Sequence, residues 1–252
     1  MKKKVRMKLI SSKKLAKDTI ELVLENEYIS EEAQPGQFVH LAVPNHTLRR
    51  PISIAEINKA AGTVTLLFKI VGEGTKALAN LSVGTEIDAL GPNGNGFPLS
   101  DLQAGDSVLI VGGGVGVPPL YFLARALHDK GMKIRAVLGF QEKEAVFYET
   151  AFQELGETQI VTNDGSYGAQ GFVTNVINEQ NPIHRYFACG PLPMLAAVQH
   201  QLKNKTGYLS FEERMGCGIG ACYACVIPTN ENAGYKKICQ DGPVFAANEV
   251  VL

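Results

Sequence analysis

The sequence predicts a multi-domain protein of β and α/β class, in which an antiparallel β-barrel precedes a parallel α/β domain and a small cysteine-rich module. Three observations predict this order. Short alternating apolar runs, separated by Gly and Pro turns, fill residues 1–100. Apolar strand-like runs then alternate with helical segments over 101–205. Residues 206–252 hold four of the five cysteines and are too few to build a conventional core alone.

The first region contains five strand-like runs, at 19–24, 37–43, 51–57, 63–71 and 85–90, with one helical segment at 75–81. Many short strands at this spacing are typical of an antiparallel barrel or sandwich. The chain begins with a lysine-rich stretch, MKKKVRMKLISSKK, that lacks the apolar core of a secretion signal. We interpret it as a solvated edge strand, because lysines discourage edge-to-edge pairing.

The second region reads as a parallel sheet covered by helices. Its predicted strands lie at 107–111, 133–140, 159–162 and 186–188, and its predicted helices at 118–129, 145–155, 173–179 and 193–203. In the last helix an apolar stripe faces one side, formed by Met194, Leu195, Val198 and Leu202. From residue 207 the periodicity ends, so the predicted boundaries fall near 100 and 205.

Composition excludes several functional classes. The 252 residues carry 24 Lys and Arg against 25 Asp and Glu, a net charge of −1, which argues against nucleic acid as the main ligand. Hydrophobic residues make up 45% and charged residues 19%, as in globular proteins. No run approaches ~18 apolar residues, so we expect no membrane span. A cytoplasmic location follows as an expectation, and cysteines there are rarely disulfide-bonded.

The most informative feature is the cysteine spacing C-x4-C-x2-C-x13-C, formed by Cys217, Cys222, Cys225 and Cys239. Its first two intervals match the plant-type [2Fe–2S] pattern. Small residues between the cysteines let the backbone approach a cluster and direct N–H groups at its sulfurs. Structural zinc is the alternative, but four-cysteine zinc sites usually come as two C-x2-C knuckles, and only one is present. Free thiols are the third possibility.

Two segments of the barrel predict a diphosphate site. Arg50 and Ser53 lie three residues apart on an extended segment, where a guanidinium and a hydroxyl can reach one diphosphate. Gly74-Thr75 begins a helix, where free N–H groups favour an anion. Taken singly, the arginine could be an ordinary surface residue and the Gly-Thr an ordinary helix cap; the combination in this order is more specific.

A glycine-rich turn and a Cys-Gly-Pro sequence predict a dinucleotide site on the α/β domain. The turn, with Gly112, Gly113, Gly114 and Gly116, lies between a strand and a helix, where a backbone can approach a pyrophosphate. It does not meet the G-x-G-x-x-G fingerprint, and a generic strand–helix turn is the alternative. Cys189-Gly190 follows a parallel strand, at the end where ligands bind; a lone buried cysteine is otherwise a small apolar residue.

Two further features bear on the nucleotide. The Gly-rich turn at 162–168 either touches the dinucleotide or is a plain loop, and the residues do not decide between these. After the second strand of the α/β domain, Glu142 would repel a 2′-phosphate and Lys143 is the only nearby cation, which favours NAD over NADP.

The Arg-x-x-Ser barrel, the Gly-rich turn and the Cys-Gly-Pro resemble the ferredoxin–NADP reductase superfamily. With the cysteine cluster added, essentially all of the chain resembles the electron-transfer subunits of type B dihydroorotate dehydrogenases. The resemblance implies an FAD-binding barrel at 1–100, an NAD-binding domain at 101–205 and a [2Fe–2S] module at 206–252. It implies FAD contacts from Arg50, Pro51, Ile52, Ser53, Leu67, Phe68, Lys69, Gly74 and Thr75. It places Cys189 and Gly190 beside the nicotinamide, with Cys189 as the candidate catalytic residue, and makes the four C-terminal cysteines the cluster ligands.

The resemblance also implies a partner. It is an FMN-containing catalytic subunit that oxidises dihydroorotate in pyrimidine biosynthesis, in a heterotetramer of two subunits of each kind. Electrons would pass from that FMN through the [2Fe–2S] cluster and FAD to NAD+. Related reductase subunits of hydrogenases, sulfite reductases and NADH–ferredoxin systems are alternatives, as is a zinc-stapled nucleotide-binding scaffold without redox activity. Most of the five scattered histidines are expected to be solvent-facing or hydrogen-bonded, and none is expected to be catalytic.

Overall fold

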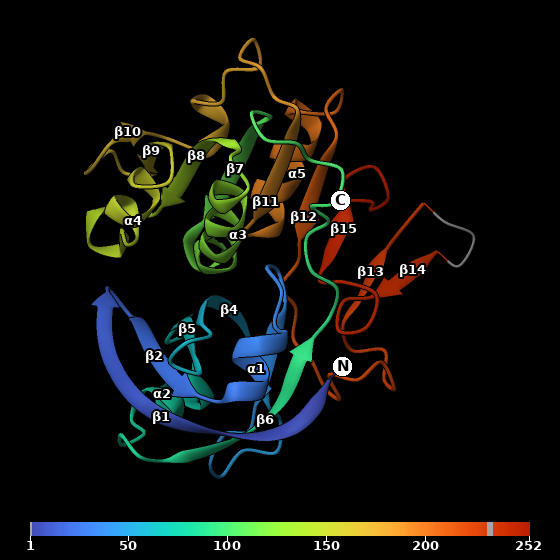
Figure 1. The fold of residues 1–252 in the computed structure, drawn as a ribbon. Coiled ribbons are helices and arrows are strands. Elements are labelled where there is room, and N and C mark those ends of the chain that lie inside the picture. Colours follow the sequence, from blue (N-terminus) through green and yellow to red (C-terminus); the bar gives the residue numbers. More distant parts are fainter. Residues whose placement is uncertain (1, 231–233) are drawn as a thin grey trace.

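The computed structural model describes residues 2–230 and 234–252 and divides the chain into a barrel, an α/β layer and a C-terminal segment beside both (Figure 1). The barrel is formed by β1 (Lys3–Ala16), β2 (Thr19–Glu25), β3 (Phe38–Leu41), β4 (Arg50–Asn58), β5 (Thr63–Lys69) and β6 (Glu86–Asn93), with α1 (Glu27–Glu32) and α2 (Glu73–Ala79). The rest of the chain contains β7 (Ser107–Gly113), α3 (Val117–Asp129), β8 (Lys133–Phe140), α4 (Glu149–Gln153), β9 (Glu157–Thr162), β10 (Ala169–Gln170), β11 (Arg185–Cys189), α5 (Leu192–Gln201), β12 (Gly207–Ser210), β13 (Val226–Pro228), β14 (Tyr235–Lys237) and β15 (Val244–Ala246).

The barrel is closed and antiparallel, in the order β1-β2-β5-β4-β3-β6, which confirms the predicted class. Its interior contains alternate side chains of every strand, such as Leu22, Ile54 and Leu66. The expectation of an edge strand at the N-terminus is wrong: β1 pairs with both β2 and β6. Closure leaves no free edge, and the lysines of β1 lie on its solvent side while Met7 and Leu9 face the core.

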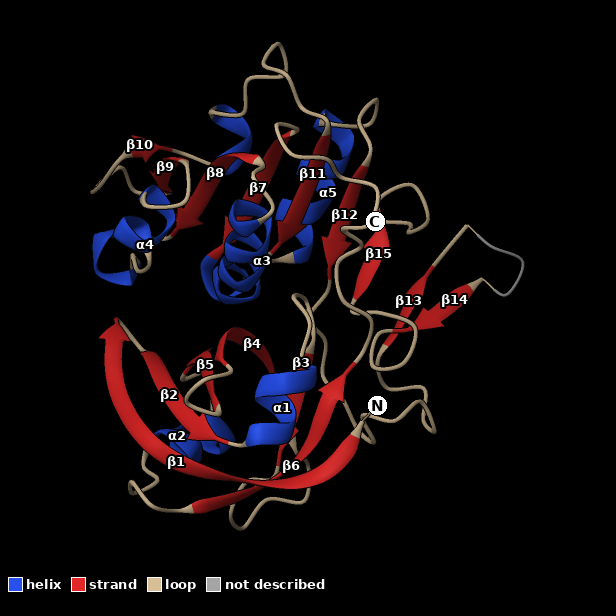
Figure 2. Ribbon diagram, in the orientation of Figure 1, coloured by secondary structure: helices blue, strands red, loops and turns tan. Residues whose placement is uncertain are grey.

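The α/β domain is built on a seven-stranded sheet in the order β10-β9-β8-β7-β11-β12-β15. All of its neighbouring strands are parallel except β12 and β15. Helix α3 covers one face through residues such as Leu120 and Leu123, and α5 covers the other through Leu195 and Val198, as Figure 2 lets the reader follow. The chain adds β8 and β9 on one side of β7 and then adds β11 and β12 on its other side. The order of strand addition therefore reverses between β7 and β11.

Two predicted helices differ from the structure, and one observed helix was not predicted. The segment 145–155 splits into a one-turn 3-10 helix at Lys143–Ala145 and the short α4, and 173–179 forms only a 3-10 turn at Val173–Asn175. There the Asn175 side chain accepts the backbone N–H of Phe172 at 2.7 Å, which competes with helix propagation. Helix α1 was not predicted; the side chain of Asn26 caps it by accepting the N–H of Ile29 at 2.9 Å.

The C-terminal segment shares the core of the α/β domain. Strands β12 and β15 lie inside the predicted third module yet join the α/β sheet, so the sheet extends past the predicted boundary near 205. Within the C-terminal segment, the β13–β14 hairpin and the loop that carries Cys217 and Cys222 lie outside the α/β sheet. Cys225 and Cys239 are buried in the same apolar cluster as Leu195 of α5 and Leu209 of β12. A segment too short for its own core thus gains one by adding strands to its neighbour.

The barrel and the α/β domain contact each other directly. Ala55 and Leu67 point out of the barrel and pack into the apolar cluster beneath α3. An ion pair from Lys17 of the barrel to Glu142 after β8 spans 2.5 Å, and Tyr148 donates to Glu21 at 3.3 Å. The two domains therefore meet on the side of β4 and β5 where the predicted flavin residues begin.

An ion pair between a buried arginine and an exposed aspartate yields a stability prediction. Arg185, at the start of β11, is buried and donates two hydrogen bonds of 2.6 Å to Asp101 in the linker between the domains. These bonds lower the pKa of Asp101 from 3.8 to about 2. A lowered folded-state pKa means that the contribution is fully present above about pH 4 and is lost as the pH falls through about 2.

We therefore expect Asp101→Asn to lower the urea midpoint at pH 7, because Arg185 loses its charged partner while staying buried. The midpoint difference from the parent chain should shrink between pH 7 and pH 3. Glu86→Gln is the control, since its pair with Arg6 is exposed and should contribute little at either pH. An Asp101 variant whose deficit grows toward low pH would contradict this account.

Candidate functional site

The two predicted diphosphate segments meet at one corner of the barrel. Arg50 begins β4 and Gly74 lies in the first turn of α2, and a β-carbon at Gly74 would stand 2.3 Å from Nη2 of Arg50. Only glycine therefore allows the guanidinium to lie across this turn. Nη1 donates to the carbonyl of Leu48 at 2.6 Å, which fixes the side chain. Among the described residues no carboxylate forms an ion pair with Arg50, so its charge is available to an anion.

The neighbouring predicted residues divide by direction. Ile52 and Phe68 belong to the barrel core, whereas Leu67 packs outward beneath α3. Pro51 and Ser53 are half-buried and alternate with the inward Ile52, so they lie on the outer face of β4. The side chains of Ile52 and Phe68 thus face the barrel core, and only their backbone groups are open to a ligand outside the barrel.

Thr75 and Lys69 complete the predicted set. The Thr75 hydroxyl accepts the N–H groups of Val71 and Gly72, at 3.0 and 3.2 Å, and donates to the Gly72 carbonyl. Its hydrogen bonds thus shape the turn that carries Gly74. Lys69 ends β5, half-buried, one strand away from β4.

The glycine-rich turn and Cys189-Gly190 meet at the topological switch point. Cys189 is the register partner of Gly112, so β7 and β11 end side by side where doubly wound sheets bind ligands. A β-carbon at Gly116 would lie 2.3 Å from the Cys189 carbonyl oxygen, and one at Gly113 would lie 2.5 Å from the Met194 sulfur. These glycines are required by contacts within the chain. At Gly114, with φ +53°, a β-carbon would meet nothing within 4 Å.

Cys189 is fully buried at the end of β11. Burial raises its pKa well above the ordinary value for a thiol, so the group is a neutral thiol at pH 7. In this state it offers a small apolar surface and a weak S–H donor. Its position beside Gly116 and Gly190 agrees with a place next to a nicotinamide ring.

Glu142 and Lys143, on which the prediction of NAD over NADP rests, follow β8, and the Gly-rich turn at 162–168 lies at the end of β9. Glu142 pairs with Lys17, so its carboxylate also holds the barrel. Lys143 donates its backbone N–H to Ser166 at 2.8 Å, which brings the turn at 162–168 against it. Asp164 accepts the N–H and hydroxyl of Ser166 at 3.0 and 2.7 Å. Both acidic groups thus stand at the carboxyl edge of the sheet, which disfavours a 2′-phosphate there.

The four C-terminal cysteines are free thiols that influence one another. The Cys222 thiol lowers the pKa of Cys217, and the Cys225 and Cys217 thiols both raise the pKa of Cys239. The N–H groups of Ile219 and Cys222 point at Cys217 Sγ at 3.5 and 3.3 Å. Burial alone would raise the pKa of Cys217, but these donors have the larger effect and lower the pKa to about 6. Burial raises the pKa of Cys239 to about 12, so a metal must displace its proton on binding.

These residues fit a two-iron cluster. A [2Fe–2S] cluster takes four cysteine thiolates, and the spacing of Cys217, Cys222 and Cys225 is the plant-type pattern, whereas four-cysteine zinc sites usually come as two C-x2-C knuckles. The loop turns sharply at Gly218 and Gly220, with φ +68° and +84°. Lys237 holds it by donating to the Gly220 carbonyl at 2.7 Å.

One residue of the site was missed in the sequence. His40 on β3 is fully buried, and neither ring nitrogen has a hydrogen-bond partner among the described residues. Most of the histidines were expected to face solvent or to be hydrogen-bonded, and His40 is an exception. Burial and the nearby Arg49 lower the pKa of His40 to about 4. No motif or residue spacing in the sequence identifies His40. The one feature that could have suggested it is its place in the strand that precedes Arg50.

Within the described part of the chain, none of the helices combines the length and the apolarity that a bilayer crossing needs.

Comparison with known proteins adds two family models. The iron–sulfur cluster binding domain of dihydroorotate dehydrogenase B matches residues 212–251, and the oxidoreductase FAD-binding domain matches residues 6–97. These ranges contain the four cysteines and the Arg50–Gly74 corner, respectively. The first match also begins just after β12, the last parallel strand of the sheet.

Full-length relatives agree with these models. The "Dihydroorotate dehydrogenase B (NAD(+)), electron transfer subunit" of Shouchella clausii is 49% identical over 100% of this chain and 99% of its own length. The protein of the same name from a Geobacillus strain is 51% identical over all of both chains. Among solved structures, the NADH-dependent reduced ferredoxin–NADP oxidoreductase matches with a TM-score of 0.87 and 28% identity, over 97% of this chain and 89% of that one. Ferredoxin–NADP+ reductase from Plasmodium falciparum, at 15% identity and TM-score 0.67, shares the fold of 80% of the chain.

Proposed function

This chain belongs to the family of the NAD(+)-linked dihydroorotate dehydrogenase B electron transfer subunits, and from that premise we propose which of its residues hold each cofactor. As a member, it is a subunit of an oxidoreductase, it binds FAD, a [2Fe–2S] cluster and NAD, and it passes electrons to NAD+. The observation that carries the assignment is the adjacency of the cysteine module to the strand pair β3–β4, where the flavin residues begin.

The proposed flavin residues are those of the barrel corner and its neighbours. Arg50 neutralises the diphosphate, and Gly74 leaves room for the guanidinium to do so. Thr75 holds the turn, while Ser53 and Pro51 offer the outer face of β4. Backbone groups of Ile52, Leu67, Phe68 and Lys69 complete the wall.

The proposed NAD residues lie at the switch point between β7 and β11. The turn containing Gly112, Gly113, Gly114 and Gly116 receives the pyrophosphate. Cys189 and Gly190 form the floor beside the nicotinamide, and the neutral Cys189 thiol limits water and charge there. NAD+ takes up two electrons at once as a hydride, whereas a [2Fe–2S] cluster exchanges one electron at a time, and FAD when bound would supply chemistry that allows both. The protein's part is to keep these sites adjacent and dry.

The partner is proposed from family membership. Since the chain is an electron transfer subunit, a catalytic subunit must supply its electrons, and we propose that this subunit carries FMN, oxidises dihydroorotate in pyrimidine biosynthesis and assembles two plus two with this chain. The cysteine loop offers a docking face, because Ile219, Tyr223 and Val226 are 51, 63 and 40% exposed there. A cytoplasmic location remains a prediction, supported by the free thiols that the cluster requires.

The related hydrogenase, sulfite reductase and NADH–ferredoxin subunits considered from the sequence are less well supported. The solved ferredoxin–NADP oxidoreductase chain is 28% identical, against 49 and 51% for the two dihydroorotate dehydrogenase relatives. The zinc-stapled scaffold is disfavoured by the plant-type cysteine spacing and by the match to an iron–sulfur cluster binding domain.

The division of labour can be tested on the purified chain, loaded with FAD and reconstituted with iron and sulfide. We expect it to oxidise NADH with an artificial acceptor and to leave dihydroorotate unchanged. Addition of the FMN-containing subunit should restore dihydroorotate-dependent NAD+ reduction. Turnover of dihydroorotate by the isolated chain would refute the assignment.

A further inference from the structure

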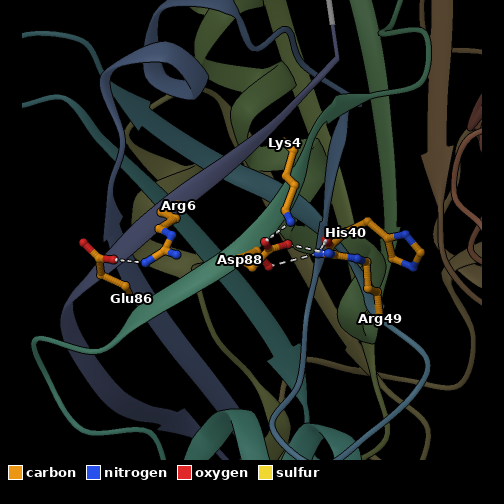
Figure 3. Close-up of polar contacts among 6 residues, drawn as sticks. All are labelled: Lys4, Arg6, His40, Arg49, Glu86 and Asp88. Carbon is orange, nitrogen blue, oxygen red and sulfur yellow. Dashed lines mark hydrogen bonds and ion pairs between the residues drawn. The ribbon is translucent and has the colours of Figure 1, made fainter.

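The buried imidazole of His40 requires a partner that the described residues do not supply. An unsatisfied polar group inside a protein costs about 1–3 kcal/mol, and buried side-chain polar atoms are paired in the large majority of cases. His40 is 0% exposed, and neither Nδ1 nor Nε2 is hydrogen-bonded within the described residues. Figure 3 shows its ring pointing away from the ion pairs that join Asp88 to Lys4 and Arg49. The ring is therefore aimed at something outside that network.

The strand register defines what His40 faces. Along β3, Val39 and Leu41 enter the barrel core, so Phe38 and His40 lie on the outer face. Phe38 belongs to the apolar cluster that contains Cys225 and Cys239. The outer face of β3 is thus covered by the cysteine module. His40 is the register partner of Pro51 in the next strand, within the proposed flavin segment.

The contact with the cysteine loop is close. A β-carbon at Gly218 would lie 2.2 Å from His40 Nδ1 and 2.8 Å from Cε1. Gly218 also has φ +68° and directly follows Cys217. Both the left-handed turn and the histidine ring therefore require glycine at this position, and the imidazole lies against the loop that holds the first ligand pair.

A cluster sulfide is a hydrogen-bond acceptor for the His40 ring that the described residues at this place do not supply. The loop already aims two backbone N–H groups at Cys217 Sγ, and hydrogen bonds to cluster sulfurs tune the reduction potential. We propose that His40 is a positioning residue that donates a ring N–H to an inorganic sulfide of the [2Fe–2S] cluster. A donor of this kind stabilises the extra negative charge of the reduced cluster and so raises its potential. His40 thereby joins the flavin-bearing sheet of the barrel to the cluster.

This inference rests on the proposed cluster ligands, and a nitrogen measurement tests the two separately. The holoprotein is labelled with 15N-histidine during expression and then reduced. Pulsed EPR measures whether a histidine nitrogen is magnetically coupled to the cluster. We expect one coupled histidine in the parent chain, and none in His40→Leu. A protein without the EPR signal of a reduced cluster would refute the cluster ligands. A normal cluster signal with no histidine coupling would refute the role of His40 alone.

Variants at two neighbouring positions then separate donation from packing. His40→Leu should shift the cluster potential to a more negative value in an EPR-monitored redox titration, and His40→Asn, which keeps an N–H donor, should recover part of the shift. Phe38→Leu is the matched control, because it alters a buried side chain on the same face of β3 without removing a donor. It should lower thermal stability and leave the potential unchanged. A potential in His40→Leu equal to that of the parent, with the cluster intact, would overturn the proposal.

Discussion

Replacing Cys222 by alanine is expected to abolish the [2Fe–2S] cluster while leaving the flavin bound. Cys222 is one of the four proposed ligands, and alanine offers no atom that could take its place on iron. Loss of one of four thiolate ligands leaves an iron under-coordinated, so the iron and sulfide content should fall from two of each per chain to near zero. Dihydroorotate-dependent NAD+ reduction by the complete complex should fall to background.

The flavin supplies the internal reference for this experiment. The barrel corner of Arg50 and Gly74 is separate from the cysteine loop, so FAD content and NADH oxidation with an artificial acceptor should persist in Cys222→Ala. Cys189→Ala serves as the cysteine control, since Cys189 lies at the end of β11 and should leave the iron and sulfide content unchanged. A Cys222→Ala protein that retained the cluster absorbance would remove Cys222 from the ligand set.

The second large effect is expected at Arg50. Its guanidinium lies across the glycine of α2 without a carboxylate partner among the described residues, so removal deletes a charged donor to the FAD diphosphate. Hydrogen bonds to charged groups contribute about 1.5–3 kcal/mol, which corresponds to a loss in FAD affinity of about 10- to 100-fold for Arg50→Ala. The measurement is FAD binding to the deflavinated chain by fluorescence quenching.

Two further variants make this result specific. Gly74→Ala should also weaken FAD binding, because its β-carbon would occupy the place of the Arg50 guanidinium. Arg6→Ala removes an exposed arginine that pairs only with Glu86 across 3.0 Å, and it should bind FAD like the parent chain. Unchanged FAD affinity in Arg50→Ala would show that the diphosphate is held elsewhere.

Features encoded within short stretches were predictable. The intervals between the four cysteines, the period-2 alternation of the barrel strands and the strand–helix alternation after residue 101 can each be read locally, because they reflect ligand spacing or the repeat of one element. The barrel, the parallel sheet and the cluster chemistry followed from them. The same reasoning predicted that Arg50, Gly74 and Gly116 belong to ligand-binding segments, which stays a prediction; the structure adds that Gly116 is required by the carbonyl of Cys189.

Features that depend on contacts between distant segments were not predictable. The lysine-rich β1 is an interior strand only because β6, some eighty residues later, closes the barrel on it. Residues 207–210 and 244–246 join the α/β sheet because the cysteine module is too small to bury its own apolar residues. His40 carries no motif, and only the fold places it against Gly218. Spacing along the chain thus determined which cofactors the protein is built for, while long-range packing decided how the sites adjoin, since a contact between remote residues leaves no periodic signal in either segment.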